Sequence, residues 1–165
     1  MHETICRRLA NCVLLFALLL LAGRPVCAEL RFTELGTISG EPGILSVYLV
    51  EGGTPSPAAA VKIREVGKVG ESNVLVGPVE LTRLKDLCAQ AVRYQDKVAK
   101  GQVVLLGSIP SANNKLDVAV VNYGGVRVAV LVAHEDDKEH TLVLNRSNAA
   151  ALSKLIEKTR ARLRP

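Results

Sequence analysis

The chain carries two similar segments about 70 residues apart, LGTISG at 35–40 and LGSIPS at 106–111. Each segment lies within the first of several short apolar runs, and each series of runs ends in a longer stretch with helical spacing. Internal similarity of this kind indicates one supersecondary unit that is present twice, with the two copies burying their apolar faces against each other. The chain is therefore expected to fold as two copies of a single unit.

The first half reads as four strands followed by a helix. In its third run, Val61 and Ile63 alternate with Lys62 and Arg64, which is typical of a strand with one apolar face. Apolar residues then recur at helical spacing, and a proline precedes that stretch while a glycine ends it. The expected strands cover 30–39, 44–50, 60–66 and 73–78, and the expected helix covers 79–101.

The second half repeats this order. Gly124 and Gly125 predict a tight hairpin between its second and third strands. Ser147 or Asn148 is expected to cap the last helix, whose apolar positions match those of the first helix. The expected strands cover 101–110, 116–123, 126–134 and 140–145, and the stripe of the last helix is Leu152, Leu155, Ile156, Thr159 and Leu163.

A four-stranded sheet with one helix leaves an apolar face exposed, and two such units can cover each other. In the strand 126–134 valines on one face alternate with alanines and a leucine on the other, so both faces are expected to be covered. The sequence therefore predicts an α+β fold, in which two tandem ββββα repeats form an intramolecular pseudo-dimer of antiparallel sheets with two helices.

The N-terminal segment 1–28 has the pattern of a secretory signal peptide. Two arginines precede an apolar run at 12–22, and small residues precede a predicted cut after Ala28. The run is shorter than the roughly 20 residues that span a membrane, which favours cleavage over an uncleaved anchor. The expected mature protein is exported to the periplasm or the cell exterior and has no transmembrane segment.

Residues 29–165 are expected to form one domain, with repeat 1 at 29–100 and repeat 2 at 101–165. Cleavage after residue 28 would remove three arginines and one glutamate, which lowers the net charge from +5 to +3. This mild charge lacks the dense basic footprint of a strong nucleic-acid binder. Cys88 would be the one remaining cysteine, and its place on the helical stripe predicts core packing instead of a nucleophilic role.

The most polar stretch is HEDDKEH at 134–140. His134 and His140 flank four carboxylates and are weak candidates for metal ligands, whereas a solvated hairpin turn explains the same residues. The sequence contains no phosphate-binding glycine loop, nucleophile elbow, paired-cysteine motif or HExxH motif. We therefore predict no cofactor and no enzymatic activity.

The order of elements resembles the Whirly-like single-stranded nucleic-acid-binding proteins, which include the positive-cofactor-four coactivators, their bacterial relatives and the purine-rich-element-binding repeat proteins. The resemblance rests on Leu35-Gly36 in the first strand, Ile63-Arg64 at the end of the third, and GPVELTRLKDL at the helix entry. Family members bind single strands on the sheet with basic and aromatic side chains. By position, the resemblance points to Lys62, Arg64, Arg127, Tyr48 and Tyr123, although a water-facing side of two strands explains the basic residues equally well.

Two functions follow from these patterns. The first is an exported, non-enzymatic binding or protein-interaction module with an unknown protein partner. The alternative is a single-stranded nucleic-acid-binding protein of the Whirly-like type. The export signal favours the first, and the family resemblance favours the second.

Overall fold

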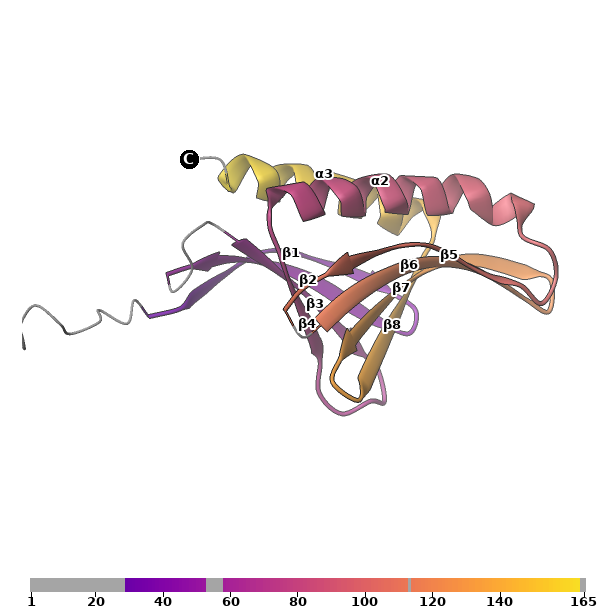
Figure 1. The fold of residues 1–165 in the computed structure, drawn as a ribbon, viewed down its shortest axis with the longest axis horizontal. Helices are drawn as coiled ribbons and strands as arrows, with labels where there is room; N and C mark the ends of the chain where they lie inside the picture. Colours follow the sequence, from indigo (N-terminus) through magenta and orange to yellow (C-terminus); the bar gives the residue numbers. More distant parts are fainter. Residues whose placement is uncertain (1–28, 53–57, 113, 164–165) are drawn as a thin grey trace, which may run out of the picture.

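The computed structural model describes residues 29–52, 58–112 and 114–163. It contains two four-stranded antiparallel sheets, each followed by one long helix, as the sequence predicts (Figure 1). The predicted signal segment 1–28 lies outside the described residues. The first repeat comprises β1 (Arg31–Gly40), β2 (Gly43–Glu51), β3 (Ala58–Glu65), β4 (Ser72–Val76), α2 (Pro78–Tyr94) and the short 3-10 helix η1 (Gln95–Lys97). The second comprises β5 (Val103–Pro110), β6 (Asn114–Tyr123), β7 (Val126–Glu135), β8 (Lys138–Leu144) and α3 (Arg146–Arg162).

The strands of each sheet follow chain order, and the same irregularity recurs in both sheets. The pairing of β1 with β2 shifts register between Glu34 and Gly36, and the pairing of β5 with β6 shifts between Leu105 and Gly107. A bulge inserts one extra residue and increases the local twist of the strand. The repeated Leu-Gly pair of the sequence is therefore the bulge of the first strand in each repeat.

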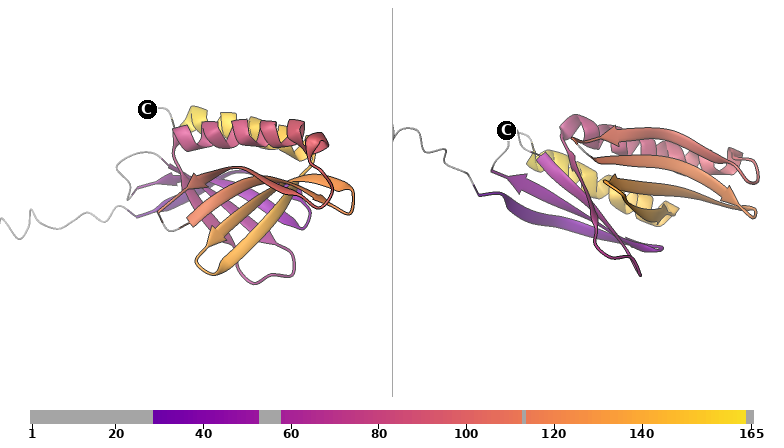
Figure 2. Two further views of the ribbon diagram at one scale, coloured as in Figure 1. Left: turned by 45° about the vertical axis from the view of Figure 1, so that its right-hand side comes forward. Right: turned by 60° about the horizontal axis from the view of Figure 1, so that its bottom comes forward.

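The two helices lie side by side in one layer above both sheets (Figures 1 and 2). Each helix packs mainly on the sheet of the other repeat: α2 contacts β5, β6 and β7, and α3 contacts β1 and β2. Lys158 of α3 extends this exchange, because its ammonium donates to the backbone carbonyl of Leu35 at 2.9 Å. The two repeats therefore share one core, and neither sheet is covered by its own helix alone.

Alternate residues of every strand enter this core. In β3, Val61 and Ile63 are buried beneath the helices, while Lys62 is half-buried and Arg64 is exposed on the opposite face, as predicted. We call the helix-covered side of each sheet the inner face and the other side the outer face. The stripe predicted for the last helix is confirmed: Leu152, Leu155, Ile156 and Thr159 are buried in α3, and Leu163 is buried at its C-cap. The apolar positions of the first helix are likewise buried, at Leu81, Leu84, Leu87, Cys88 and Ala91 in α2.

The prediction that both faces of β7 are covered is confirmed for its inner face but only in part for its outer face. Leu131 on the inner face is fully buried, whereas Val126 is 67% exposed and Val128 is half-buried. Both helices lie on the inner side, so outer-face side chains of this sheet shield mainly one another. Val130 is buried there between its register partners Ala119 and Val143.

The edge strands β4 and β8, where the two sheets meet, are held by two equivalent hydrogen bonds. The Glu65 carboxylate, at the end of β3, accepts from the backbone amide of Thr141 in β8 at 3.0 Å. The Glu135 carboxylate, at the end of β7, accepts from the backbone amide of Asn73 in β4 at 3.0 Å. Each repeat thus satisfies an edge-strand donor of the other, which supports the predicted pseudo-dimer.

Helix α3 begins two to three residues earlier than the predicted caps. Its N-cap is Asn145, whose side chain accepts from the backbone amide of Asn148 at 2.8 Å. Ser147 and Asn148 lie inside the first turn, because the strand ends at Leu144 and Asn145 offers an equally good capping side chain. Within the described residues, neither helix is both long enough and apolar enough to cross a membrane.

Candidate nucleic-acid interface

The outer face of the first sheet carries a cation within reach of two aromatic rings. Phe32 of β1, Tyr48 of β2 and Lys62 of β3 all project on this face, because the strand register places them opposite the side that carries the buried Val47 and Val61. The Lys62 Nζ lies 5.0 Å from the ring centroid of Tyr48 and 5.9 Å from that of Phe32. Both separations are within cation–π range, so the rings hold the ammonium at the middle of the sheet.

An ion pair also engages Lys62. Its Nζ lies 2.7 Å from Glu71 Oε1, with the two side chains 25% and 42% exposed. A pair this exposed contributes only about 0–1 kcal/mol, because water screens it and two long side chains lose freedom. The ammonium is therefore available to another anion that displaces Glu71.

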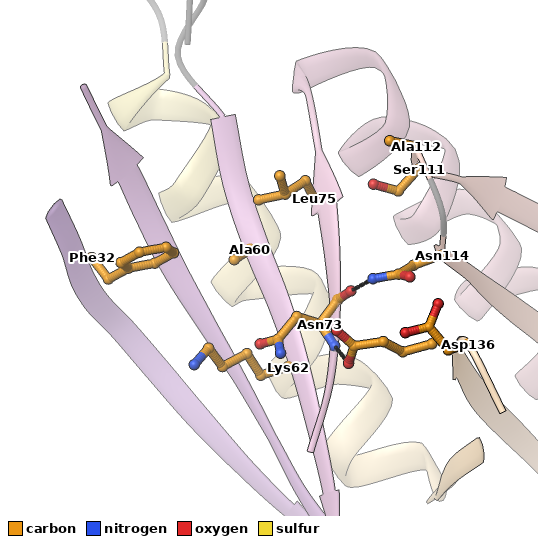
Figure 3. A pocket seen from close by; sticks show the side chains of 10 residues that line it. Phe32, Ala60, Lys62, Asn73, Leu75, Ser111, Ala112, Asn114 and Asp136 are labelled. Atoms are coloured by element: carbon orange, nitrogen blue, oxygen red, sulfur yellow. Dashed lines mark hydrogen bonds between the residues drawn. The ribbon is translucent and has the colours of Figure 1, made fainter. Parts of the chain in front are cut away.

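An open pocket of about 430 Å³ adjoins this cation (Figure 3). Its floor is the outer face of β3 and β4, with Ala60 and Leu75, and Phe32 stands at one side. The opposite side comes from the second repeat, through the loop between β5 and β6 and the turn between β7 and β8. The lining residues are Phe32, Ala60, Lys62, Asn73, Leu75, Ser111, Ala112, Asn114, Glu135 and Asp136.

Hydrogen bonds across the repeats fix the walls of this pocket. The backbone amide of Asn73 donates to Glu135, and its carbonyl accepts from Asn114 Nδ2 at 2.5 Å, so this residue of β4 joins the floor to the side formed by the second repeat (Figure 3). The Asn73 side-chain oxygen is buried and has no hydrogen-bond partner among the described residues. The pocket exists only because the two repeats meet, and its shape depends on their docking.

The five residues that the resemblance singles out do not form one site. Tyr48, Lys62 and Arg64 lie together on the outer face of the first sheet. Arg127 lies near the end of the β6–β7 hairpin, and its Nε donates to the carbonyl of Val98 at 3.1 Å on the inner face. Tyr123 precedes the turn of that hairpin and is 84% exposed on the second sheet.

The alternation of side chains along β7 explains why Arg127 lies on the inner face. Arg127 shares its side of the strand with Ala129, Leu131 and Ala133, which are all buried beneath the helices. The position in the repeat that points to Arg127 carries no information on this alternation, which places Arg127 on the inner face. Phe32 lies two residues before Glu34 in β1, so both side chains project on the outer face. This period of two in the sequence could have identified Phe32 as a member of the site.

The two histidines point to different sides of the second sheet. His134 lies between carboxylates, with Nε2 at 3.0 Å from Asp117 and Nδ1 at 2.9 Å from Glu139. His140 is buried and its Nδ1 lies 2.9 Å from the Ser72 hydroxyl. In the described part of the chain, no group of three histidine, cysteine or acidic side chains is placed to hold a metal ion.

The carboxylate of Asp117, next to His134, accepts hydrogen bonds from two other side chains. Burial raises the pKa of this carboxyl, but hydrogen bonds from Lys115 at 2.8 Å and Ser108 at 2.5 Å, together with the charge of Lys115 and the nearby His134, outweigh burial and hold its pKa below the usual value. The turn between His134 and His140 is the expected solvated hairpin, with Asp136 and Asp137 at its tip. These contacts explain the polar stretch as a stabilised turn.

No family model and no curated protein matches the chain. Among solved structures, the chain is similar to the plant transcriptional regulator PBF-2. The identity is 8%, the TM-score is 0.45, and the match covers 81% of this chain and 82% of that chain. The similarity concerns the arrangement of elements alone, so the function has to be inferred from the geometry of the site.

Proposed function

We propose that the chain is a non-enzymatic binding protein that holds single-stranded nucleic acid on the outer face of its first sheet. The observation that supports this proposal is the Lys62 ammonium, which lies within cation–π distance of both the Phe32 and the Tyr48 ring on an open sheet surface. Bases stack on exposed aromatic rings, and cations between the rings bind the phosphates. Of the two functions predicted from the sequence, this surface favours single-stranded nucleic-acid binding. Interaction with a protein partner stays a prediction.

The same surface favours single strands over duplexes. Ring faces can stack only on bases that are already unpaired, and a duplex keeps its base faces inside the stack. Among the described residues of the first sheet, Lys62 and Arg64 are the cations on this face, so they can contact about two phosphates. Because each phosphate contact on a single strand contributes about 0.7 to the log–log salt slope, the expected slope is shallow, at roughly 1 to 2.

The direct test is a titration by fluorescence anisotropy. A labelled single strand of about 12 nucleotides that contains all four bases and a duplex of the same length are each titrated with the purified protein across a salt series. We expect binding to the single strand, weaker binding to the duplex, and the shallow slope given above. Absence of single-strand binding at physiological salt would refute the proposed function.

Variants assign the binding to this face. Lys62→Gln should reduce the salt slope by about 0.7, and Tyr48→Ala should weaken binding by about 5-fold or more through loss of stacking. Lys100→Gln is the matched control, because Lys100 is an exposed lysine in the turn after η1, away from the outer face of the first sheet. Equal losses in Lys62→Gln and Lys100→Gln would indicate nonspecific charge attraction.

We also propose that the protein acts outside the cytoplasm, as its N-terminal pattern indicates. Its nucleic-acid ligand would then be extracellular or periplasmic. Mass spectrometry of the protein recovered from its source tests this directly. A mature chain that begins at Glu29 is expected, and a full-length chain recovered from the cytoplasm would contradict export.

A further inference from the structure

We infer that the pocket beside Lys62 is a base-reading site, which takes a nucleobase with an exocyclic amino group and selects against thymine and uracil. This inference rests on the proposed function, because it names the bases that the single-strand site prefers. It is carried by a pocket with a cation at one side, a flat apolar floor, and hydrogen-bond acceptors at the other side.

The acceptors come from the second repeat. Asp136 lines the pocket, and its carboxylate has no hydrogen bond or ion pair with any residue that the structure describes. Its backbone lies in the left-handed region with φ +52°, which aspartate and asparagine tolerate better than most residues. Asn114 adds a second acceptor, because its Nδ2 is already used on the Asn73 carbonyl and its oxygen is left for a ligand.

The floor suits a flat ring. Leu75 is 46% exposed and Phe32 is 52% exposed, and Ala60 between them adds no bulk above the sheet. Apolar surfaces left open in this way favour a planar apolar face over a charged group. A base that lies on Ala60 and Leu75 places its polar edge toward Asp136, on the side away from Lys62 (Figure 3).

The polarity of the two sides sets the orientation of a nucleotide. Its phosphate is attracted to Lys62, and its base edge meets acceptors at Asp136 and Asn114. Cytosine, adenine and guanine each carry an exocyclic amino group that donates to such acceptors, whereas thymine and uracil offer only the N3 hydrogen, flanked by two carbonyl oxygens that a carboxylate repels. The pocket therefore selects by donors on the base, and Asp136 is the specificity-determining residue.

The test compares labelled oligodeoxycytidylate with labelled oligodeoxythymidylate of equal length at neutral pH. We expect the purified protein to bind the cytidylate about 5-fold or more tightly. Asp136→Asn should lower this ratio toward one, since a carboxylate acceptor is replaced by an amide. Asp137→Asn is the matched control, because it removes the same charge from the neighbouring turn position.

The outcomes separate this inference from the proposed function. Equal binding of both oligonucleotides by the unchanged protein overturns the base-reading pocket and leaves the single-strand function standing. A preference that persists in Asp136→Asn, or disappears equally in Asp137→Asn, also overturns the assignment to Asp136. Absence of binding to either oligonucleotide overturns the proposed function together with this inference.

Discussion

Leu155 of α3 packs directly onto Gly36 of β1, so that a Cβ added at Gly36 would lie 2.9 Å from Leu155 Cδ1. The second repeat contains the reciprocal contact, in which a Cβ at Gly107 of β5 would lie 3.0 Å from Leu87 Cδ2 of α2. Both glycines belong to the bulges of the first strands. Each Leu-Gly motif therefore has glycine at the point where the helix of the other repeat packs on the strand, because a larger side chain there would overlap a leucine of that helix.

The first prediction concerns this contact. Gly36→Val should lower the free energy of unfolding by about 1–3 kcal/mol, because the new side chain overlaps Leu155 and forces repacking. Leu155→Ala opens space at the same point, so the double variant should be less destabilised than the sum of the single variants. Urea unfolding of the four proteins measures this coupling. Simple additivity would contradict a direct contact between the two positions.

The repeat architecture could be predicted from sequence because its signals are local. The leucines at 84, 87, 152 and 155 mark the helix stripes, and the Leu-Gly pairs mark the bulges. The pocket could not be predicted, because Asp136 and Ser111 reach it from the second repeat. No local pattern fixes how the edges of two sheets meet, and that geometry depends on buried contacts such as Glu65 with Thr141.

A second prediction concerns the buried pair where the two edge strands meet. Ser72 of β4 and His140 of β8 are fully buried, and the hydroxyl of Ser72 lies 2.9 Å from His140 Nδ1. Ser72→Ala leaves that ring nitrogen without a partner, so unfolding should become easier by about 1–3 kcal/mol. Ser46→Ala is the control, because it removes an exposed hydroxyl contact to Thr37 and should change stability by less than about 0.5 kcal/mol. Equal effects of the two substitutions would contradict this account.

A third prediction is a loss of stability in acid. Burial raises the pKa of the Glu65 carboxyl, but the hydrogen bonds from Lys68 and from the Thr141 amide outweigh it and hold the pKa below its usual 4.5. Below pH 4.5 the unfolded chain therefore binds a proton that the folded chain still excludes, so stability is present above this pH and is lost as pH falls further. The advantage of the unchanged protein over Glu65→Gln in denaturant unfolding should be largest near neutral pH and should shrink in acid. A constant difference at neutral and acidic pH would contradict the prediction.

A fourth prediction concerns alkaline solution. Burial raises the pKa of the Cys88 thiol from 9.0 to about 12. Above pH 9 the unfolded chain loses a proton that the folded chain retains, so this contribution to stability is full below pH 9 and declines as pH rises toward 12. The stability of the unchanged protein should fall more steeply over this range than that of Cys88→Ala. In the folded protein the thiol should react with a thiol reagent far more slowly than in denaturant, and rapid reaction of the native chain would show that the thiol is accessible.

The last prediction tests whether Glu71 competes with the ligand. Glu71 Oε1 lies 2.7 Å from Lys62 Nζ and forms an ion pair with it. A phosphate that binds Lys62 therefore has to displace this carboxylate. Glu71→Gln removes that charge while keeping the side-chain length, and it should tighten binding of a labelled single strand by about 2- to 5-fold at low salt, with the gain shrinking as salt rises. Asp96→Asn, an exposed change of the same charge in η1, controls for the general effect of a more positive protein. Equal gains from the two variants, or a gain that persists when Lys62 is also replaced by glutamine, would show that Glu71 acts through net charge and not through Lys62.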